Sequence, residues 1–413
     1  MSVAEHRKRL YELLEDNTIV LSYAGIPLHS NEDDYYNFEV NSQFYYLTGL
    51  ERDHMAFLAF KTKGQVMETL FIEEPQPLQE RWTGKMPTIE EVQQVSQIED
   101  VRYVEDLDAL VSRYMGRYHV EHAYFDLYRC SVEDLMDYNA LKAEEFQAKY
   151  PGVTMNDLHG ICVGLREVKD ADEIELVRKA INITRQGLDN LMANLKPGMM
   201  EYQAQADFEY MCRKLGAKKF SFGTIAASGI NGCMMHYSTN DSVIEDDSLL
   251  LLDLGAKYQN YCSDISRTYP ANGTFTQRQK DVYNVVLKAN KEVAKTARPG
   301  MTLRELNDVA KQVLGEGLIE LGLIEDVEDV GQYYMHGVSH SIGIDCHDAD
   351  FAGQKIQPGW IISDEPGLYI DEEKIGIRIE DDLLITENGC EVLSKDIIKE
   401  PDEIEAFMKA HKG

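Results

Sequence analysis

The chain has 413 residues, a length that accommodates two or three domains of typical size. Its composition is 44% hydrophobic and 27% charged, which is ordinary for a globular protein and excludes disorder along the whole chain. Asp and Glu together number 72 against 41 Lys and Arg, so the formal net charge is −31 and the acidic surface repels phosphate groups. We therefore expect no nucleic-acid partner and no membrane partner.

The sequence shows no pattern that would direct the chain out of the cytoplasm. No apolar run approaches the ~18 residues of a membrane helix, and residues 1–16 lack the apolar core of a secretion signal. The seven cysteines are scattered and form no C-x-x-C pair, which is typical of reduced thiols rather than of disulfides or a zinc site. We expect a cytoplasmic protein.

The first part of the chain mixes strand and helix patterns. Residues 18–24 and 55–60 are rich in β-branched and aromatic residues and predict strands, whereas residues 90–97 and 131–149 predict helices. Breakers at Tyr150-Pro151-Gly152 and a charged stretch after them indicate a domain boundary near residues 155–170. We therefore expect an N-terminal mixed α/β domain over 1–165 and a second domain over 166–413.

The second domain carries an internal repeat. A helix with an apolar stripe from Ile174 to Leu195 ends at Pro197-Gly198-Met199, and a helix over 281–297 ends at Pro299-Gly300-Met301. Another amphipathic helix follows each stop, over 203–215 and over 303–321. The matched units predict two halves related by a pseudo-two-fold axis, with a cleft between them as the natural place for a site.

Two aspartates stand in strand patterns of the first half. Asp253 lies inside the apolar run 249–254, where an ionised carboxylate is costly unless it is paired or binds a metal. Asp264 lies in a second strand pattern, 261–266. A hairpin turning at Tyr258-Gln259 would place the two carboxylates directly opposite each other, and a cation would relieve their repulsion. Tyr-Gln suits a tight turn poorly, so a wider or bulged loop remains an alternative.

Two glutamates and an arginine stand in the second half. The run 375–380 predicts the last clear strand, and its alternation puts Arg378 and Glu380 on the face opposite the isoleucines. Glu365 follows the strand pattern 360–364, which must end there because Pro366 cannot continue a central strand.

Four histidines complete the set of candidate site residues. His336 and His340 are four residues apart and lie on one side of either a helix or a strand. His347 follows in Cys346-His347-Asp348, and His236 lies in the first half.

In their order and local strings, five of these residues resemble the metal ligands of the pita-bread metallopeptidases, the superfamily of methionine aminopeptidase, aminopeptidase P, prolidase and creatinase. They are Asp253, Asp264, His340, Glu365 and Glu380. Residues 31–36 and 41–49 resemble the N-terminal domain of aminopeptidase P, which methionine aminopeptidases lack. The resemblance implies an α/β (α+β) protein with a C-terminal pita-bread catalytic domain and an N-terminal α/β domain of aminopeptidase P type.

The resemblance also implies a dinuclear metal site. Asp264 and Glu380 would bridge two divalent ions, Asp253 would bind one of them, and His340 with Glu365 the other. Four carboxylates and one imidazole form a hard, oxygen-rich donor set, which favours Mn²⁺. A hydroxide bridging the two ions would then attack the carbonyl that precedes a proline.

Further roles follow from the same resemblance. Glu365 would pass a proton to the leaving proline nitrogen, while His236 and His347 would hold the substrate and stabilise the oxyanion. His336 would line the proline-side pocket, and Arg378 would orient a carboxylate ligand.

Two aromatic residues are assigned to substrate binding in the same way. Tyr369 is similar in position to a site tyrosine of the family. Trp82, in the string 81–85, resembles part of a loop that reaches the site of a neighbouring subunit, which would make the protein a homodimer or homotetramer. Its alternative is an ordinary surface aromatic.

The sequence leaves several functions open. The leading expectation is an Xaa-Pro aminopeptidase, which releases the first residue of peptides that have proline in the second position. An Xaa-Pro dipeptidase would share the chemistry but accept only dipeptides, and creatinase is a more distant relative that does not need the full metal set. A non-catalytic peptide-binding module on the same fold is disfavoured because all five ligand positions are retained.

Overall fold

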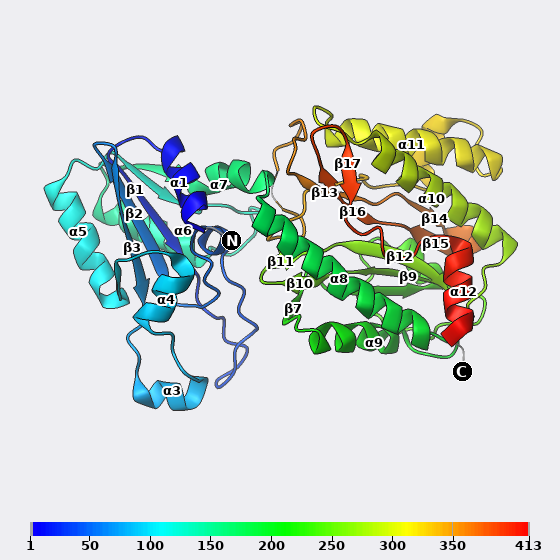
Figure 1. Cartoon of the computed structure of the whole chain (residues 1–413), viewed down its shortest axis with the longest axis horizontal. Coiled ribbons are helices and arrows are strands. Elements are labelled where there is room, and N and C mark those ends of the chain that lie inside the picture. The colour runs from blue at the N-terminus through cyan, green and yellow to red at the C-terminus, as the bar shows by residue number, and fades with distance from the viewer. Residues whose placement is uncertain (1–2, 349, 412–413) are drawn as a thin grey trace. The chain divides into compact units, whose positions relative to one another are not determined.

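The computed structural model describes residues 3–348 and 350–411. The chain divides between residues 166 and 167 into two compact units, each built from both helices and strands (Figure 1). The expected domain boundary, between residues 165 and 166, lies next to this division. Within the described ranges, no helix combines the length and the apolar character that crossing a bilayer requires.

The first unit is built on one mixed sheet of six strands in the order β4-β3-β2-β1-β5-β6. These strands are β1 (Thr18–Tyr23), β2 (Ala56–Thr62), β3 (Gln65–Ile72), β4 (Val101–Tyr103), β5 (His122–Phe125) and β6 (Thr154–Asp157). β2 pairs antiparallel with β1 and β3, whereas β4, β5 and β6 run parallel to their inner neighbours. The two predicted strands are thereby confirmed as β1 and β2.

Helices flank this sheet, and α5 and α6 pack against its strands to form the main apolar core of the unit. They are α1 (Val3–Leu13), α2 (Ser42–Thr48), α3 (Pro77–Thr83), α4 (Ile89–Ser96), α5 (Leu107–Arg117), α6 (Tyr138–Lys149) and α7 (Leu158–Glu167). The predicted helix 90–97 is α4. The predicted helix 131–149 is wrong over its first turns, because Asp137 caps α6 by accepting a hydrogen bond from Ala140 N. Val132 and Leu135 before it are 95% and 93% exposed and pack on no core.

The second unit contains four small antiparallel sheets, ordered β11-β10-β7, β12-β9-β8, β13-β16-β17 and β14-β15. The helices are α8 (Ala171–Asn194), α9 (Glu201–Lys214), α10 (Gln277–Thr296), α11 (Leu303–Glu320) and α12 (Pro401–His411). The strands are β7 (Lys219–Phe220), β8 (Ile225–Ser228), β9 (Leu249–Leu254), β10 (Ala256–Tyr258), β11 (Tyr261–Cys262), β12 (Ile265–Pro270), β13 (Ile361–Asp364), β14 (Gly367–Ile370), β15 (Ile375–Arg378), β16 (Asp381–Ile385) and β17 (Cys390–Val392).

The repeat predicted for this unit is present in the backbone. α8 packs against α9 and α10 against α11, and the two helix pairs lie around the strands of the unit (Figure 1). At the two Pro-Gly stops, Gly198 and Gly300 adopt φ values of +85° and +89°, which favour glycine. Gly198 N donates to Ile244 O at 2.8 Å, and Gly300 N donates to Ile356 O at 2.9 Å. The two halves therefore anchor the same turn in the same way.

The hairpin that carries the two aspartates has a different register from the one predicted. It turns at Gln259 and Asn260, both with positive φ, as a two-residue turn between antiparallel strands requires. Moving the turn by one residue shifts the pairing by two, so Asp253 lies opposite Ser266. The prediction that the two aspartates lie directly opposite each other is therefore wrong. Asp264 lies instead in the break between β11 and β12.

The C-terminal strand pattern also differs from the prediction. β15 ends at Arg378, and β16 and β17 follow it, so the run 375–380 is not the last strand. The pairing of β15 with β14 ends at Arg378, and Glu380 N donates instead to Ser266 O at 3.0 Å. The end of β13 before Pro366 is confirmed.

A candidate metal centre

A cavity of about 600 Å³ in the second unit collects most of the predicted site residues. All five candidate metal ligands line it, together with His236, His336, His347 and Arg378. Tyr369 is buried and is not one of the residues that line the cavity. Trp82 belongs to the first unit, where it lies on α3 and is 84% exposed.

The first half supplies two of the candidate ligands, Asp253 from β9 and Asp264 from the break between β11 and β12. Asp253 lies near the end of β9, so the apolar residues around it hold its carboxylate at the cavity wall. Asp264 is held by its backbone, since its N donates to Asp382 Oδ2 at 3.3 Å. Gly255 permits this arrangement, because Ser263 O lies only 1.9 Å from where a Cβ on Gly255 would be.

The second half supplies the other three from chain segments that β13 and β12 fix. His340 and Ser363 are tied by two hydrogen bonds, from His340 N to Ser363 Oγ and from Ser363 N to His340 O, each 2.9 Å. Glu365 N donates to Val338 O at 2.9 Å. Glu380 accepts a hydrogen bond from Ser266 Oγ at 2.8 Å. The ligand-bearing segments are thus fixed by main-chain hydrogen bonds together with those of the Ser363 and Ser266 hydroxyl groups.

The ligand atoms lie at distances that suit a shared cation. His340 Nε2 lies 3.4 Å from Asp264 Oδ2 and 3.6 Å from Glu365 Oε1. One ligand atom each from Asp264, His340 and Glu380 lie within 4.8 Å of one another. Asp253 Oδ1 is buried and has no hydrogen-bond partner among the described residues. A buried carboxylate oxygen without a donor is costly, and a cation would satisfy it.

The electrostatics of the cavity lead to the same interpretation. Burial raises the pKa of Asp253 to about 6, although the charge of Arg378 opposes the rise. Burial and the neighbouring carboxylates raise the pKa of Glu365 to about 7 and that of Glu380 well above its usual range. Carboxylates that resist ionisation because they are buried and lie close to one another form the donor set that divalent cations bind. The residues present therefore fit a divalent metal site.

The histidines have different environments. Burial lowers the pKa of His340, but the Asp264 carboxylate beside it prevails and raises it to about 9. Burial lowers the pKa of His336 to about 4, and its Nε2 lies 2.8 Å from Tyr369 OH. The pKa of His347 is also lowered by burial, and its ring stacks on that of His340 at 3.9 Å between centroids. His236 is exposed on the cavity wall.

The guanidinium of Arg378 donates hydrogen bonds to a candidate ligand and to two of its neighbours. Its Nη2 donates to Asp253 Oδ2 at 2.6 Å, its Nε to Ser266 Oγ at 2.8 Å, and its Nη1 to Tyr369 OH at 3.0 Å. Because Ser266 in turn donates to Glu380, one guanidinium connects two candidate ligands and Tyr369. Tyr369 thus contacts the site through Arg378 and His336.

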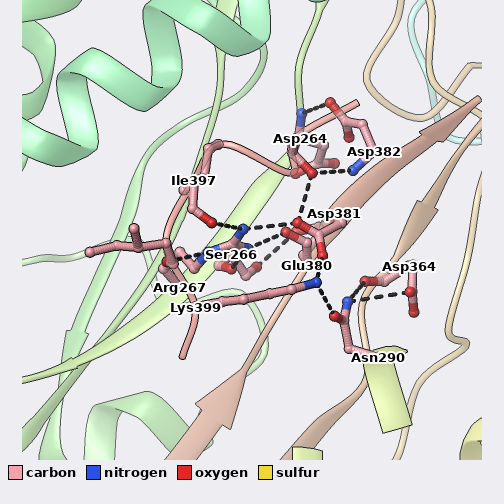
Figure 2. Close-up of polar contacts among 12 residues, drawn as sticks. Asp264, Ser266, Arg267, Asn290, Asp364, Glu380, Asp381, Asp382, Ile397 and Lys399 are labelled. Atoms are coloured by element: carbon pink, nitrogen blue, oxygen red, sulfur yellow. Dashed lines mark hydrogen bonds and ion pairs between the residues drawn. The ribbon is translucent and has the colours of Figure 1, made fainter. Parts of the chain in front are cut away.

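The sequence did not indicate a buried ionic network beside the cavity (Figure 2). Arg267 donates through Nη1 to Glu380 O at 2.5 Å and through Nη2 to Asp381 Oδ1 at 2.8 Å. Lys399 pairs with the other carboxylate oxygen of Asp381 and donates to Asn290 Oδ1 at 2.6 Å. Asn290 Nδ2 then donates to the carbonyl oxygen of Asp364, the residue before Glu365, at 3.2 Å. The sequence signal for this network was the pair of charged residues Asp381-Asp382, which stands directly before an apolar strand pattern.

One cysteine was also missed as a site neighbour. The Cys346 thiol donates to Asp264 Oδ2 at 2.9 Å, and burial raises the pKa of this thiol well above its usual range. Cys346 is a free thiol, as expected for the cysteines, but its contact with a candidate ligand could not be predicted from the sequence.

Comparisons with known proteins cover both units. Residues 175–387 match metallopeptidase family M24, and residues 3–124 match the aminopeptidase P N-terminal domain. The Xaa-Pro aminopeptidase of Haemophilus influenzae is 30% identical over 98% of this chain and 96% of its own length. A Bacillus anthracis structure described as a candidate aminopeptidase P is 41% identical, covers 99% of this chain and 98% of its own, and has a TM-score of 0.97. Escherichia coli aminopeptidase P with the inhibitor Pro-Leu is 29% identical, covers 100% and 99%, and has a TM-score of 0.89.

Proposed function

The chain belongs to metallopeptidase family M24 as a protein of the aminopeptidase P type with the pita-bread fold, and from this membership we propose its reaction in detail. A member of this family is a metallopeptidase, and the similarity to Xaa-Pro aminopeptidases identifies the chain as a metal-dependent Xaa-Pro exopeptidase. We propose that it is an Xaa-Pro aminopeptidase that works on peptides with proline in the second position through a dinuclear metal site. The observation that carries the proposal is the convergence of five ligand-type side chains on one cavity.

In this proposal two divalent cations would be held by the carboxylates of Asp253, Asp264, Glu365 and Glu380 and by the imidazole of His340. The unpartnered Oδ1 of Asp253 and the raised pKa values of Asp253 and Glu365 support it. The oxygen-rich donor set favours Mn²⁺. Bound there, the cations would lower the pKa of a shared water molecule and polarise the substrate carbonyl, so the chain itself needs no nucleophilic side chain.

The other residues act on the substrate and on protons. Glu365, on the cavity wall, carries a proton to the leaving proline nitrogen. His236 and His347 supply N–H donors to the carbonyl oxygen as its charge develops, and stacking on His340 keeps the His347 ring in place. Arg378 acts through Asp253, whose carboxylate it orients.

The preference for proline is assigned to the part of the cavity wall that His336 forms, with Tyr369 behind it. A bond that precedes proline has no N–H, so a site that recognises it relies on the shape of the pyrrolidine ring rather than on a hydrogen bond to the nitrogen. His336 is held by Tyr369 OH, and its lowered pKa keeps the ring neutral near pH 7, which suits contact with an apolar ring.

The assembly and the location of the protein complete the proposal. The exposed indole of Trp82 on α3 supports a homodimer or homotetramer in which it reaches the site of another subunit. All seven cysteines are free, which supports a cytoplasmic location. Light scattering of the purified protein tests the assembly, and a monomer at working concentration would contradict it.

The test of the proposed function combines metal analysis with peptide hydrolysis. We expect two equivalents of divalent metal per chain, loss of activity with a chelator, and recovery with Mn²⁺. An Xaa-Pro-Yaa-Zaa peptide should be cut between the first residue and proline. Cleavage of Xaa-Pro dipeptides alone would identify a dipeptidase instead, and activity indifferent to the chelator would contradict the metal mechanism.

A further inference from the structure

A buried carboxylate far along the chain from the candidate ligands organises one wall of the cavity. Glu201 is the first residue of α9 and is 0% exposed. Its Oε1 accepts hydrogen bonds from Ser228 N at 2.6 Å, Ser228 Oγ at 2.7 Å and Asn231 Nδ2 at 3.0 Å. Its Oε2 accepts from Tyr237 OH at 2.7 Å and Ser242 N at 3.0 Å. Every one of these donors comes from residues 228–242.

The segment 228–242 is the part of the cavity wall that contains His236. After the short 3₁₀ helix Gly229–Cys233 it has no helix or strand up to residue 242, so its own backbone does little to fix it. Glu201 holds both ends of the segment, because its carboxylate binds Ser228 and Ser242 and its own N donates to Ser242 O at 3.0 Å. It also binds Tyr237, the residue next to His236.

We propose that Glu201 is a positioning residue for His236, which it fixes against the cavity by binding both ends of the segment 228–242 and the residue next to the imidazole. The inference rests on the proposed function of His236. Glu201 does not line the cavity and touches none of the candidate ligands, so it acts only through this segment.

The chemistry of the carboxylate makes the proposal specific. An ionised carboxylate only accepts hydrogen bonds, and here donors surround both of its oxygens. The N-terminal end of α9 further stabilises its negative charge. A glutamine at this position has the same shape, but its NH₂ group would face a donor such as Ser242 N or Ser228 N, which cannot accept. Glu201→Gln should therefore loosen the segment without leaving a cavity.

The matched control is Glu209→Gln, the same change on the same helix at a half-buried residue that accepts from Gln205. We expect Glu201→Gln to lower kcat/KM by roughly 10- to 100-fold, the range for groups that orient active residues. The control should stay near the wild-type value, and bound metal should be equal in all three proteins. Tyr237→Phe, which removes a single donor, should have an intermediate effect and remains informative if Glu201→Gln does not fold.

A double-mutant cycle with His236→Ala separates positioning from a general structural role. If Glu201 acts through His236, Glu201→Gln should change kcat/KM by less than about 3-fold when His236 is already alanine. An equal loss in both backgrounds would overturn the proposal, as would wild-type kinetics of Glu201→Gln.

Hydrogen exchange gives a readout that does not depend on the reaction. Peptides covering residues 229–242 should exchange faster in Glu201→Gln than in the wild type or in Glu209→Gln, whereas peptides from α10 should not change. Unchanged exchange in this segment would overturn the inference even in an active enzyme. If the wild type cleaves no Xaa-Pro peptide, the proposed function fails, and the exchange result still decides whether Glu201 fixes the segment.

Discussion

Arg378 and Asp253 lie in the two different halves of the second unit and form a buried ion pair, with 2.6 Å between Nη2 and Oδ2. The pair uses one carboxylate oxygen of Asp253, and within residues 3–348 and 350–411 the other oxygen, Oδ1, has no hydrogen-bond partner. Because Arg378 also donates to Ser266 and Tyr369, its guanidinium cannot rotate away from this position without losing several hydrogen bonds. The orientation of the candidate ligand is therefore set by the neighbouring half.

Replacing Arg378 with lysine tests this relationship. Lysine keeps the charge but cannot donate in three directions from a planar group, so Asp253 should lose its fixed orientation. We expect metal affinity and kcat/KM to fall by roughly 10- to 100-fold. Titration calorimetry with Mn²⁺ and peptide kinetics measure both quantities. The exposed Arg298→Lys is the control, and equal behaviour of the two variants would contradict the assignment.

Asp264→Ala tests the bridging position. Removing the carboxylate that lies beside His340 should abolish metal binding and activity together, since both proposed cations lose a ligand. The variant should still fold, because the change also relieves repulsion with Asp253 and Glu365. Elemental analysis, circular dichroism and peptide turnover check the three expectations, with the exposed Asp247→Ala as control. Retained turnover would show that Asp264 does not bridge.

Lys399→Met tests the ionic network of Figure 2. The change removes one of the cations that neutralise the buried Asp381 and breaks the link through Asn290 toward Asp364. Because it leaves a buried charge less well paired, we expect the free energy of unfolding to fall by about 2–4 kcal/mol. Urea denaturation of the metal-free protein measures this change. The exposed neighbour Lys395→Met should be close to neutral, and equal midpoints for the two variants would contradict the role of the network.

The pair between Arg178 on α8 and Glu391 on β17 predicts a pH dependence. Two hydrogen bonds, 3.1 and 2.7 Å long, and the charge of Arg178 lower the pKa of Glu391 below its usual value. Its stabilising contribution is therefore complete above the unfolded-state pKa near 4.5 and is lost as the pH falls through the lower folded-state pKa. Both side chains are about one-third exposed, so the contribution at pH 7 should stay below about 1 kcal/mol.

Unfolding of Glu391→Gln at several pH values checks this prediction. The difference in the free energy of unfolding between the variant and the wild type should be constant from pH 8 to about pH 5.5. Below about pH 4 it should shrink toward zero. It should also shrink in 0.5 M salt, because screening weakens exposed pairs. Glu387→Gln, an exposed residue of the same segment, is the control. A difference that grows with falling pH would have the wrong sign for a lowered pKa.

The sequence predicted the elements whose signals are local. The long amphipathic helices became α8 and α10, and the repeated Pro-Gly stops became matched turns with positive φ at Gly198 and Gly300. The start of α10 was placed at residue 281, four residues too late, because its capping box at Thr276 and Gln279 precedes the apolar stripe.

Features that depend on distant contacts were not predictable in the same way. The hairpin register followed from the positive φ of Gln259 and Asn260, and a shift of one residue at the turn moved the partner of Asp253. The contact of Cys346 with Asp264 and the chain from Lys399 to Asp364 join residues far apart in sequence, so no local pattern announces them. The candidate ligands themselves were recognisable because each sits in a distinctive string.

The repeat has a consequence for how the catalytic unit can be assembled from fragments. Asp253 and Asp264 precede the loop 271–276, while His340, Glu365 and Glu380 follow it, so neither half contains a full donor set. A chain cut in that loop should yield two inactive polypeptides that regain metal binding only when mixed. Each half would then complete the donor set of the other.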